Sequence, residues 1–234
     1  MIMPSESAAL GLGWRDKASG YHTRENGMTE ELVFYTHPMS RGRIVRWMLE
    51  EVGRPYRTEI LDFGSSMRDA AYLAINPMGK VPALRHGDTI VTEAAAICAY
   101  LADAFPDAGL APPLGDRRRG PYYRWLFFAA GPVEAAVTNK SLGVEVPAER
   151  QGTVGYGSLG SVTDALERAV SQGDYIAGDR FSAADVYVGS QIGWGMRFGS
   201  IEKRPAFERY WDRIGSRPAA QRAREIDDAL LPAR

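Results

Sequence analysis

Two short runs of residues have the types and spacing that could together bind a small peptide. They are Asn76–Leu84 and Val91–Ile97. Pro82 cannot donate to a sheet ladder, so it belongs at the start of a strand. A cis bond between Val81 and Pro82 would turn the backbone N–H and C=O of Val81 outward, where an extended peptide could pair with them. Glu93 stands at the mouth of a helix that begins at Ala94, where free N–H groups favour a carboxylate on the ligand. The two runs therefore predict one site that binds a peptide by its backbone and its charged end.

The elements that must position this site follow from the apolar pattern. A short apolar run, 32–35, predicts a buried strand that leads into a loop at Thr36-His37-Pro38. Ser40 can cap a helix that Gly53 closes, and the alternation over 56–60 predicts a second strand. The apolar residues of that helix recur at helical spacing: Ile44, Val45, Met48, Leu49 and Val52. A strand, a helix and a strand in this order predict the opening of a parallel unit.

The remaining strands and helices fall into two groups. The Pro82 strand, a turn at 86–88, a strand over 89–91 and a helix over 93–104 complete the first group. Beyond a linker rich in Pro and Gly, strand signals almost vanish. Helices are predicted near 117–140, 156–171, 183–195, 205–215 and 219–229. Gly131-Pro132 should kink the first of them, and Ser182 with Asp185 should form a capping box at the third.

The run from Tyr35 to Arg43, Tyr-Thr-His-Pro-Met-Ser-Arg-Gly-Arg, followed by the Pro82 run and Glu93, resembles the N-terminal half of cytosolic glutathione transferases. The match is to bacterial, serine-type members, and it extends from about residue 30 to the C-terminus. The resemblance implies an α/β thioredoxin-like N-terminal domain followed by an all-α C-terminal domain. It also implies glutathione as co-substrate, no metal, and a homodimer.

The domain boundaries expected from these patterns divide the chain into four parts. They are a flexible N-terminal extension at 1–29, a thioredoxin-like glutathione-binding domain at 30–108, a linker at 109–116 and a helical domain at 117–234. The first 28 residues are rich in Ser, Gly, Ala and charge and lack periodicity. Met28 could serve as an alternative start, so the extension is either a tail or upstream coding sequence.

Ser40 is the expected catalytic residue. The thiolate is the nucleophile, and a thiol with a pKa near 8.5 is only a few per cent ionised at neutral pH. Lowering that pKa by about two units takes ~2.7 kcal/mol, which one charge-assisted hydrogen bond and a helix N-terminus can supply. Ser40 is placed for both, and the resemblance to serine-type members implies the same role. The alternatives are a plain helix-capping serine, or a shift that brings Met39, Arg41 or Tyr35 to the thiol.

The resemblance also assigns the residues that would bind glutathione: Lys80, Val81, Pro82, Glu93 and Ala94. Lys80 would attract the glycine carboxylate, Val81 would pair through its backbone, and Glu93 would accept from the α-ammonium group. Most family members carry Ser or Thr where this chain has Ala94. The backbone donor remains but the hydroxyl is lost, which should weaken binding by about 0.5 to 1.5 kcal/mol.

The electrophile would lie against aromatic residues of the helical domain. Tyr122 or Tyr123 could line that pocket, and further aromatic residues end a later helix at Trp194 and Phe198. The expected reaction is attack of the glutathione sulfur on a small, apolar electrophile. A glutathione-dependent isomerase, dehalogenase or disulfide reductase is an alternative, as is a non-catalytic binding or regulatory protein.

Composition excludes several other classes. The 234 residues carry 28 Lys and Arg against 29 Asp and Glu, a balance that gives no global attraction to nucleic acid or membrane. Apolar runs are short and broken, so no segment should cross a bilayer. Cys98 is the single cysteine, which allows no internal disulfide and no thiolate metal cluster. It should be a buried, inert thiol in a cytoplasmic protein.

Overall fold

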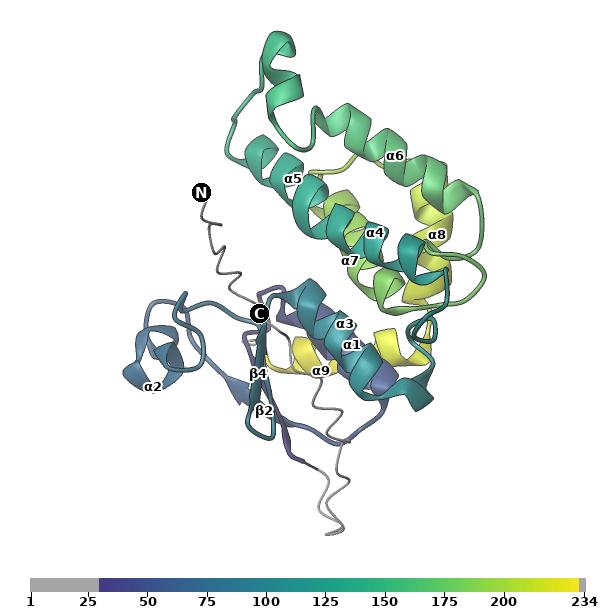
Figure 1. Cartoon of the computed structure of the whole chain (residues 1–234). Helices are drawn as coiled ribbons and strands as arrows, with labels where there is room; N and C mark the ends of the chain where they lie inside the picture. Colours follow the sequence, from purple (N-terminus) through teal and green to yellow (C-terminus); the bar gives the residue numbers. More distant parts are fainter. Residues whose placement is uncertain (1–29, 232–234) are drawn as a thin grey trace, which may run out of the picture. The chain divides into compact units, whose positions relative to one another are not determined.

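The computed structural model describes residues 30–231, so the expected extension at 1–29 lies outside the described residues. A four-stranded mixed sheet has the order β2-β1-β3-β4 (Figure 1). β1 (Leu32–Thr36) pairs in parallel with β2 (Arg57–Ile60). β3 (Ala83–His86) lies antiparallel to both β1 and β4 (Thr89–Thr92). The predicted parallel unit is confirmed, and β3 begins directly after Pro82.

The two faces of the sheet carry different helices because alternate side chains of a strand point to opposite sides. Phe34 and Leu84 belong to the main apolar core together with α1 (Gly42–Val52) and α3 (Ala94–Ala104). Tyr35 faces the other way, against a small cluster that includes Tyr72 of α2 (Ala70–Leu73). The five apolar residues predicted for the inner face of α1 are all buried.

The start of α1 differs from the prediction by one residue. Arg41, and not Ser40, is the residue that precedes the helix, whose first residue is Gly42. Ser40 instead ends a turn, because its N–H donates to the carbonyl of His37 at 3.1 Å. Gly53 ends α1 in the left-handed conformation with φ 68°, as predicted.

The second half of the described chain is helical. Its helices are α4 (Arg119–Phe128), α5 (Glu134–Ser141), α6 (Leu159–Ser171), α7 (Ala183–Phe198), α8 (Pro205–Gly215) and α9 (Pro218–Ala229). The kink predicted at Gly131-Pro132 is a π-helical turn, Ala129–Val133, that joins α4 to α5. Ser182 and Asp185 form the predicted capping box at α7, and none of the described helices is long and apolar enough to cross a membrane.

Asp185 is the centre of a buried polar cluster that fixes the start of α7. Its carboxylate accepts from the Ser182 N–H at 2.9 Å, the Ile176 N–H at 2.7 Å and the Tyr210 hydroxyl at 2.8 Å. Burial nevertheless raises the pKa of this carboxyl to about 6, because these bonds offset only part of the loss of water. The cluster ties α7, α8 and the preceding loop together, which agrees with a role in folding.

The C-terminal helix α9 packs against α1 of the thioredoxin-like half. Two basic residues near the start of α1 pair with two acids near the end of α9, and two acids near the end of α1 pair with basic residues nearer the start of α9. The pairs are Arg43–Asp228, Arg46–Asp227, Glu50–Arg222 and Glu51–Arg217. This order places the two helices antiparallel and links the last described helix to the first.

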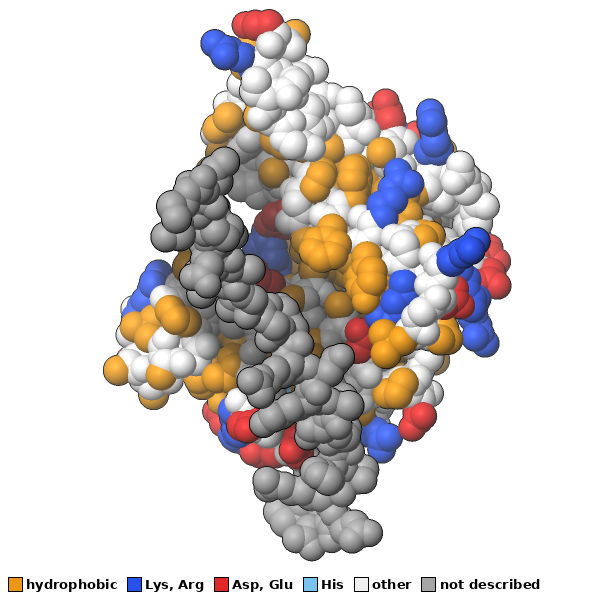
Figure 2. All heavy atoms as spheres, viewed as in Figure 1, with side chains coloured by type: hydrophobic (Ala, Val, Ile, Leu, Met, Phe, Trp, Pro, Cys, Tyr) orange, Lys and Arg blue, Asp and Glu red, His pale blue; other side chains and the backbone are white. Residues whose placement is uncertain are grey.

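Apolar side chains that remain exposed are concentrated in part on α4. Tyr123 is 38% exposed and Phe127 72% exposed. Figure 2 shows apolar side chains, in orange, over the middle of the same face of the molecule on which Figure 1 shows α4. An exposed aromatic surface of this kind is a candidate contact with another protein chain.

Gly193 is required for the close packing of α7 on α8. A Cβ atom at this position would lie 2.7 Å from the ring of Trp211, which is too close for any real contact. We expect Gly193→Ala to lower the free energy of unfolding by about 1 to 3 kcal/mol because the ring must shift. Urea denaturation measures this, with Gly120→Ala as the control, since a Cβ at Gly120 meets nothing within 4 Å. Equal stability of the two variants would contradict the assignment.

Candidate functional site

A cavity of about 330 Å³ brings together residues that are distant in the sequence. All five residues expected to bind the peptide line it: Lys80, Val81, Pro82, Glu93 and Ala94. The opposite wall comes from the helical half and includes Ala130, Glu134 and Tyr187. Sequence reasoning expected the first group, whereas the second group became visible only in the folded chain.

The turn before β3 fixes the backbone that the ligand would meet. The hydroxyl of Tyr72 and the amide of Asn76 both donate to the carbonyl of Lys80, at 2.6 and 2.7 Å. Gly79 has φ 58°, and a Cβ there would lie 2.8 Å from the carbonyl of Met67. The turn therefore needs glycine for both its conformation and its packing.

The bond between Val81 and Pro82 is cis, which is the condition on which the peptide-binding edge was expected. Val81 precedes β3, and neither its N–H nor its C=O has a hydrogen-bond partner among residues 30–231. An unpaired backbone donor and acceptor beside a cavity can bind an extended peptide by the same geometry that joins two strands. This edge is the feature of the site that is most specific for a peptide.

Glu93 and Lys80 supply opposite charges on the same cavity. Glu93 has φ 66° and is the one residue other than glycine with a positive φ in the described part of the chain. This strained conformation places it directly before α3, where the N–H groups of the first turn favour an anion. Lys80 is exposed and has no acidic partner within residues 30–231. The cavity can therefore meet both an ammonium group and a carboxylate.

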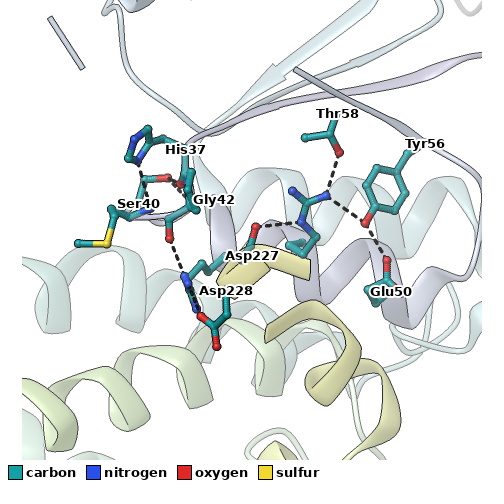
Figure 3. Close-up of polar contacts among 12 residues, drawn as sticks. His37, Ser40, Gly42, Glu50, Tyr56, Thr58, Asp227 and Asp228 are labelled. Carbon is teal, nitrogen blue, oxygen red and sulfur yellow. Dashed lines mark hydrogen bonds and ion pairs between the residues drawn. The ribbon is translucent and has the colours of Figure 1, made fainter. Parts of the chain in front are cut away.

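Ser40 lies next to the cavity but is not one of the residues that line it, whereas its neighbour Arg41 is. The Ser40 hydroxyl donates to the carbonyl of His37 at 2.7 Å, and its oxygen accepts from the Gly42 N–H at 3.0 Å (Figure 3). The oxygen is held at the entry to α1, and its hydrogen points into the loop. Rotation of the hydroxyl alone would redirect the hydrogen without moving the oxygen.

Arg41 and Glu134 form an ion pair across the cavity that sequence reasoning did not anticipate. The Arg41 Nε also donates to Glu134 Oε2 at 3.3 Å, and the amide of Gln191 donates to the same oxygen at 3.1 Å. Tyr187 lines the cavity as well, and burial raises its pKa to about 12, so its hydroxyl stays protonated. In the sequence, three of the four strands and the helices α3 and α4 lie between Arg41 and Glu134, so no local pattern indicates the pair.

Two aromatic residues close to Ser40 in the sequence do not line the cavity. Tyr35 packs against Tyr72 with ring centroids 5.7 Å apart, and His37 packs against Phe63 at 4.4 Å. Tyr122 and Tyr123, which were expected to line the electrophile pocket, are not among the residues that line this cavity. Tyr122 is fully buried in the core, and Tyr123 is exposed and accepts from Arg119. Adjacent residues on a helix point in different directions, and on α4 neither Tyr122 nor Tyr123 lines the cavity.

Two further expectations about side-chain chemistry concern metal ions and Cys98. Among residues 30–231, no group of three His, Cys, Asp or Glu could hold a metal ion. Cys98 is fully buried in α3, and burial raises the pKa of its thiol well above the ordinary range. The prediction of an inert thiol is confirmed.

Known proteins share both the sequence patterns and the fold. Residues 39–104 match the family model "Glutathione S-transferase, N-terminal domain", and residues 157–218 match "Glutathione S-transferase, C-terminal domain". Glutathione S-transferase GstA of Escherichia coli O157:H7 is 31% identical over 161 residues, which are 68% of this chain and 76% of that protein. The chain belongs to the glutathione S-transferase family.

Two other similar proteins bear on the site. A sphingomonad glutathione S-transferase solved with glutathione matches with a TM-score of 0.68 and 28% identity, over 84% of this chain and 98% of that one. The maleylacetoacetate isomerase of Pseudomonas aeruginosa is 30% identical over 178 residues, 73% of this chain and 82% of that protein. The proteins similar to this chain are thus named for two different reactions.

Proposed function

We propose that this glutathione S-transferase family member binds glutathione in the 330 Å³ cavity and activates its thiol for attack on a small electrophile. The observation that carries the proposal is the unpaired Val81 backbone at a cis peptide bond, on a cavity that also holds Lys80 and Glu93. The glutathione backbone pairs with Val81, its glycine carboxylate faces Lys80, and its ammonium group donates to Glu93. The backbone N–H of Ala94 meets the γ-glutamyl carboxylate without a hydroxyl beside it.

Ser40 is the proposed catalytic residue. Its oxygen is held by the Gly42 N–H at 3.0 Å, which polarises the hydroxyl and makes it a better donor. The hydroxyl hydrogen then turns from the His37 carbonyl to the glutathione sulfur and stabilises the thiolate. The sulfur bonds to the electrophilic carbon, the leaving group departs, and the thiol proton passes to solvent.

Calorimetric titration with glutathione tests the binding part of the proposal. We expect Glu93→Gln to raise the dissociation constant for glutathione about tenfold, because a hydrogen bond to a charged group contributes ~1.5 kcal/mol or more. Lys80→Gln should have a smaller effect, about threefold, since Lys80 is exposed. Glu149→Gln and Lys203→Gln are the matched controls because both residues are exposed and lie outside the cavity.

The same titration separates the alternatives. Binding weaker than millimolar would favour a non-catalytic family member, for which the loss of a hydroxyl at Ala94 is the supporting observation. Tight binding without transfer to any electrophile would favour an isomerase, as the named Pseudomonas aeruginosa relative suggests. A panel of transferase, isomerase, dehalogenase and reductase substrates decides between the reactions.

We also propose that the protein is a cytoplasmic homodimer. The exposed Tyr123 and Phe127 of α4 give it an aromatic surface that a second copy could cover. The single, buried Cys98 agrees with a reducing setting. Sedimentation at a mass of one chain would reject the dimer.

A further inference from the structure

The charges around the glutathione cavity leave one cation without a ligand group. Among the described residues, the charged side chains that line this cavity are Arg41, Lys80, Glu93 and Glu134. Glutathione with an ionised thiol carries two carboxylates, an ammonium group and the thiolate. The proposed binding mode uses Lys80, Glu93 and the backbone N–H of Ala94 for the carboxylates and the ammonium group. Arg41 remains as the lining cation, and the thiolate remains as the ligand charge without a counter-charge.

Arg41 lies between the proposed thiol donor and the proposed backbone contact. It follows Ser40 directly in the chain and precedes Gly42, the first residue of α1. Its side chain lines the same cavity as Val81, whereas Ser40 is not among the lining residues. A guanidinium group at this place carries a permanent positive charge at the side of the cavity where Ser40 would meet the sulfur.

The helical half of the chain holds this guanidinium group in place. Arg41 makes two hydrogen bonds to the Glu134 carboxylate, from Nε to Oε2 at 3.3 Å and from Nη2 to Oε1. The amide of Gln191, on α7, donates to the same Oε2 at 3.1 Å and so fixes the carboxylate in turn. Two parallel bonds between a guanidinium and a carboxylate set the orientation of both groups. Glu134 therefore determines where the positive charge of Arg41 lies.

The other titratable groups close to the pair do not supply this charge. Tyr187 lines the cavity, but burial raises its pKa to about 12, so it is neutral at physiological pH. His37 packs against the ring of Phe63 and does not line the cavity. Lys80 and Glu93 face the charged ends of the bound peptide in the proposed mode. The pair of Arg41 and Glu134 is therefore the charged feature left to act on the sulfur.

We propose that Arg41 is a second catalytic residue, which stabilises the glutathione thiolate by its charge, and that Glu134 is a positioning residue that holds Arg41 on the cavity. This role rests on the proposed function, because it needs glutathione in the cavity. The Ser40 hydroxyl donates a hydrogen bond to the sulfur, Arg41 supplies the positive charge beside it, and the thiol proton goes to solvent. Glu134 also offsets part of the charge. A thiolate that is stabilised too strongly is a weaker nucleophile, so a fully unpaired Arg41 would not give the fastest attack.

Two substitutions in the pair should move the pKa of the bound thiol in opposite directions. The measurement is the ultraviolet absorbance of the thiolate against pH, with the full-length protein saturated with glutathione. Arg41→Gln leaves the Glu134 carboxylate unpaired, so we expect the thiol pKa to rise by about one unit. Glu134→Gln leaves the guanidinium unpaired, so we expect the thiol pKa to fall by about half a unit. A purely structural role of the pair would shift both variants in the same direction or neither of them.

A conservative variant and a matched ion pair serve as controls. Arg41→Lys keeps the positive charge without the two parallel bonds, so it should recover most of the shift seen in Arg41→Gln. Arg204 pairs with Glu167 at 2.7 Å, with side chains 20% and 38% exposed, and neither residue lines the cavity. The side chains of Arg41 and Glu134 are comparably exposed, at 52% and 28%. Arg204→Gln and Glu167→Gln should therefore leave the thiol pKa unchanged.

The outcomes separate this role from the proposed function. If glutathione binds but the thiol pKa shifts in the same direction in Arg41→Gln and Glu134→Gln, or in neither, the role of Arg41 is overturned and the binding site stands. The same holds if Arg41→Lys behaves like Arg41→Gln. If Arg41→Gln does not fold, the result for Glu134→Gln decides alone, and an unchanged or raised pKa there overturns the role. Failure of the unaltered protein to bind glutathione in calorimetry would reject the proposed function and this role together.

Discussion

Replacement of Ser40 by alanine is expected to lower turnover at saturating glutathione by at least tenfold. The variant removes the hydroxyl that stabilises the thiolate, and tenfold corresponds to ~1.4 kcal/mol, about the contribution of one hydrogen bond to a charged group. The KM for glutathione should change little, because the binding residues on the cavity remain. At saturating glutathione, the pKa seen in kcat/KM for the electrophile should shift upward, since the bound thiol then ionises at higher pH.

A structural effect of the same substitution must be separated from the catalytic one. Ser40→Ala also leaves the Gly42 N–H without its acceptor, which weakens the start of α1. Ser158→Ala is the matched control, because the Ser158 hydroxyl accepts from a backbone N–H at 3.1 Å at the start of α6. Both variants should lose about 1 kcal/mol of stability, and only Ser40→Ala should lose activity. Unchanged turnover in Ser40→Ala would exclude the hydroxyl as the activating group.

Replacement of Arg46 by methionine is expected to destabilise the protein by about 3 to 5 kcal/mol. Arg46 and Asp227 are only 2% and 1% exposed, and they join α1 to α9 through a bond of 3.1 Å. Arg46 also donates to the hydroxyls of Thr58, at 2.8 Å, and Tyr56, at 3.2 Å (Figure 3). Methionine would leave the Asp227 carboxylate buried without a counter-charge, and one of its oxygens already has no partner.

Urea denaturation measures this loss, and two further variants define its origin. Arg222→Gln removes the exposed pair with Glu50 between the same two helices and should cost at most about 0.5 kcal/mol. The double variant Arg46→Met with Asp227→Leu should recover much of the stability, because no buried charge remains. If the double variant is no more stable than Arg46→Met, the loss comes from packing and not from an unpaired charge.

The agreement between pattern and structure was closest where the signal is local. The inner face of α1, the left-handed Gly53 and the helical bounds of α8 follow from residues within a few positions of each other. The start of α1 was misplaced because Ser40 has two possible partners for its hydroxyl, and only the folded loop shows that it bonds to His37 and Gly42. A capping serine and a turn serine carry the same sequence signal.

The sequence by itself determined the family, the order of strands and helices, and five of the residues that line the 330 Å³ cavity, because motif residues stand at the ends of elements that it also predicts. Only the tertiary structure decided which distant side chains meet. It paired Arg41 with Glu134 and Arg46 with Asp227, and it gathered three tryptophans from α1, α7 and α8 into one cleft. Such contacts depend on how helices cross and pack, and no local periodicity specifies the partner of a residue nearly two hundred positions away.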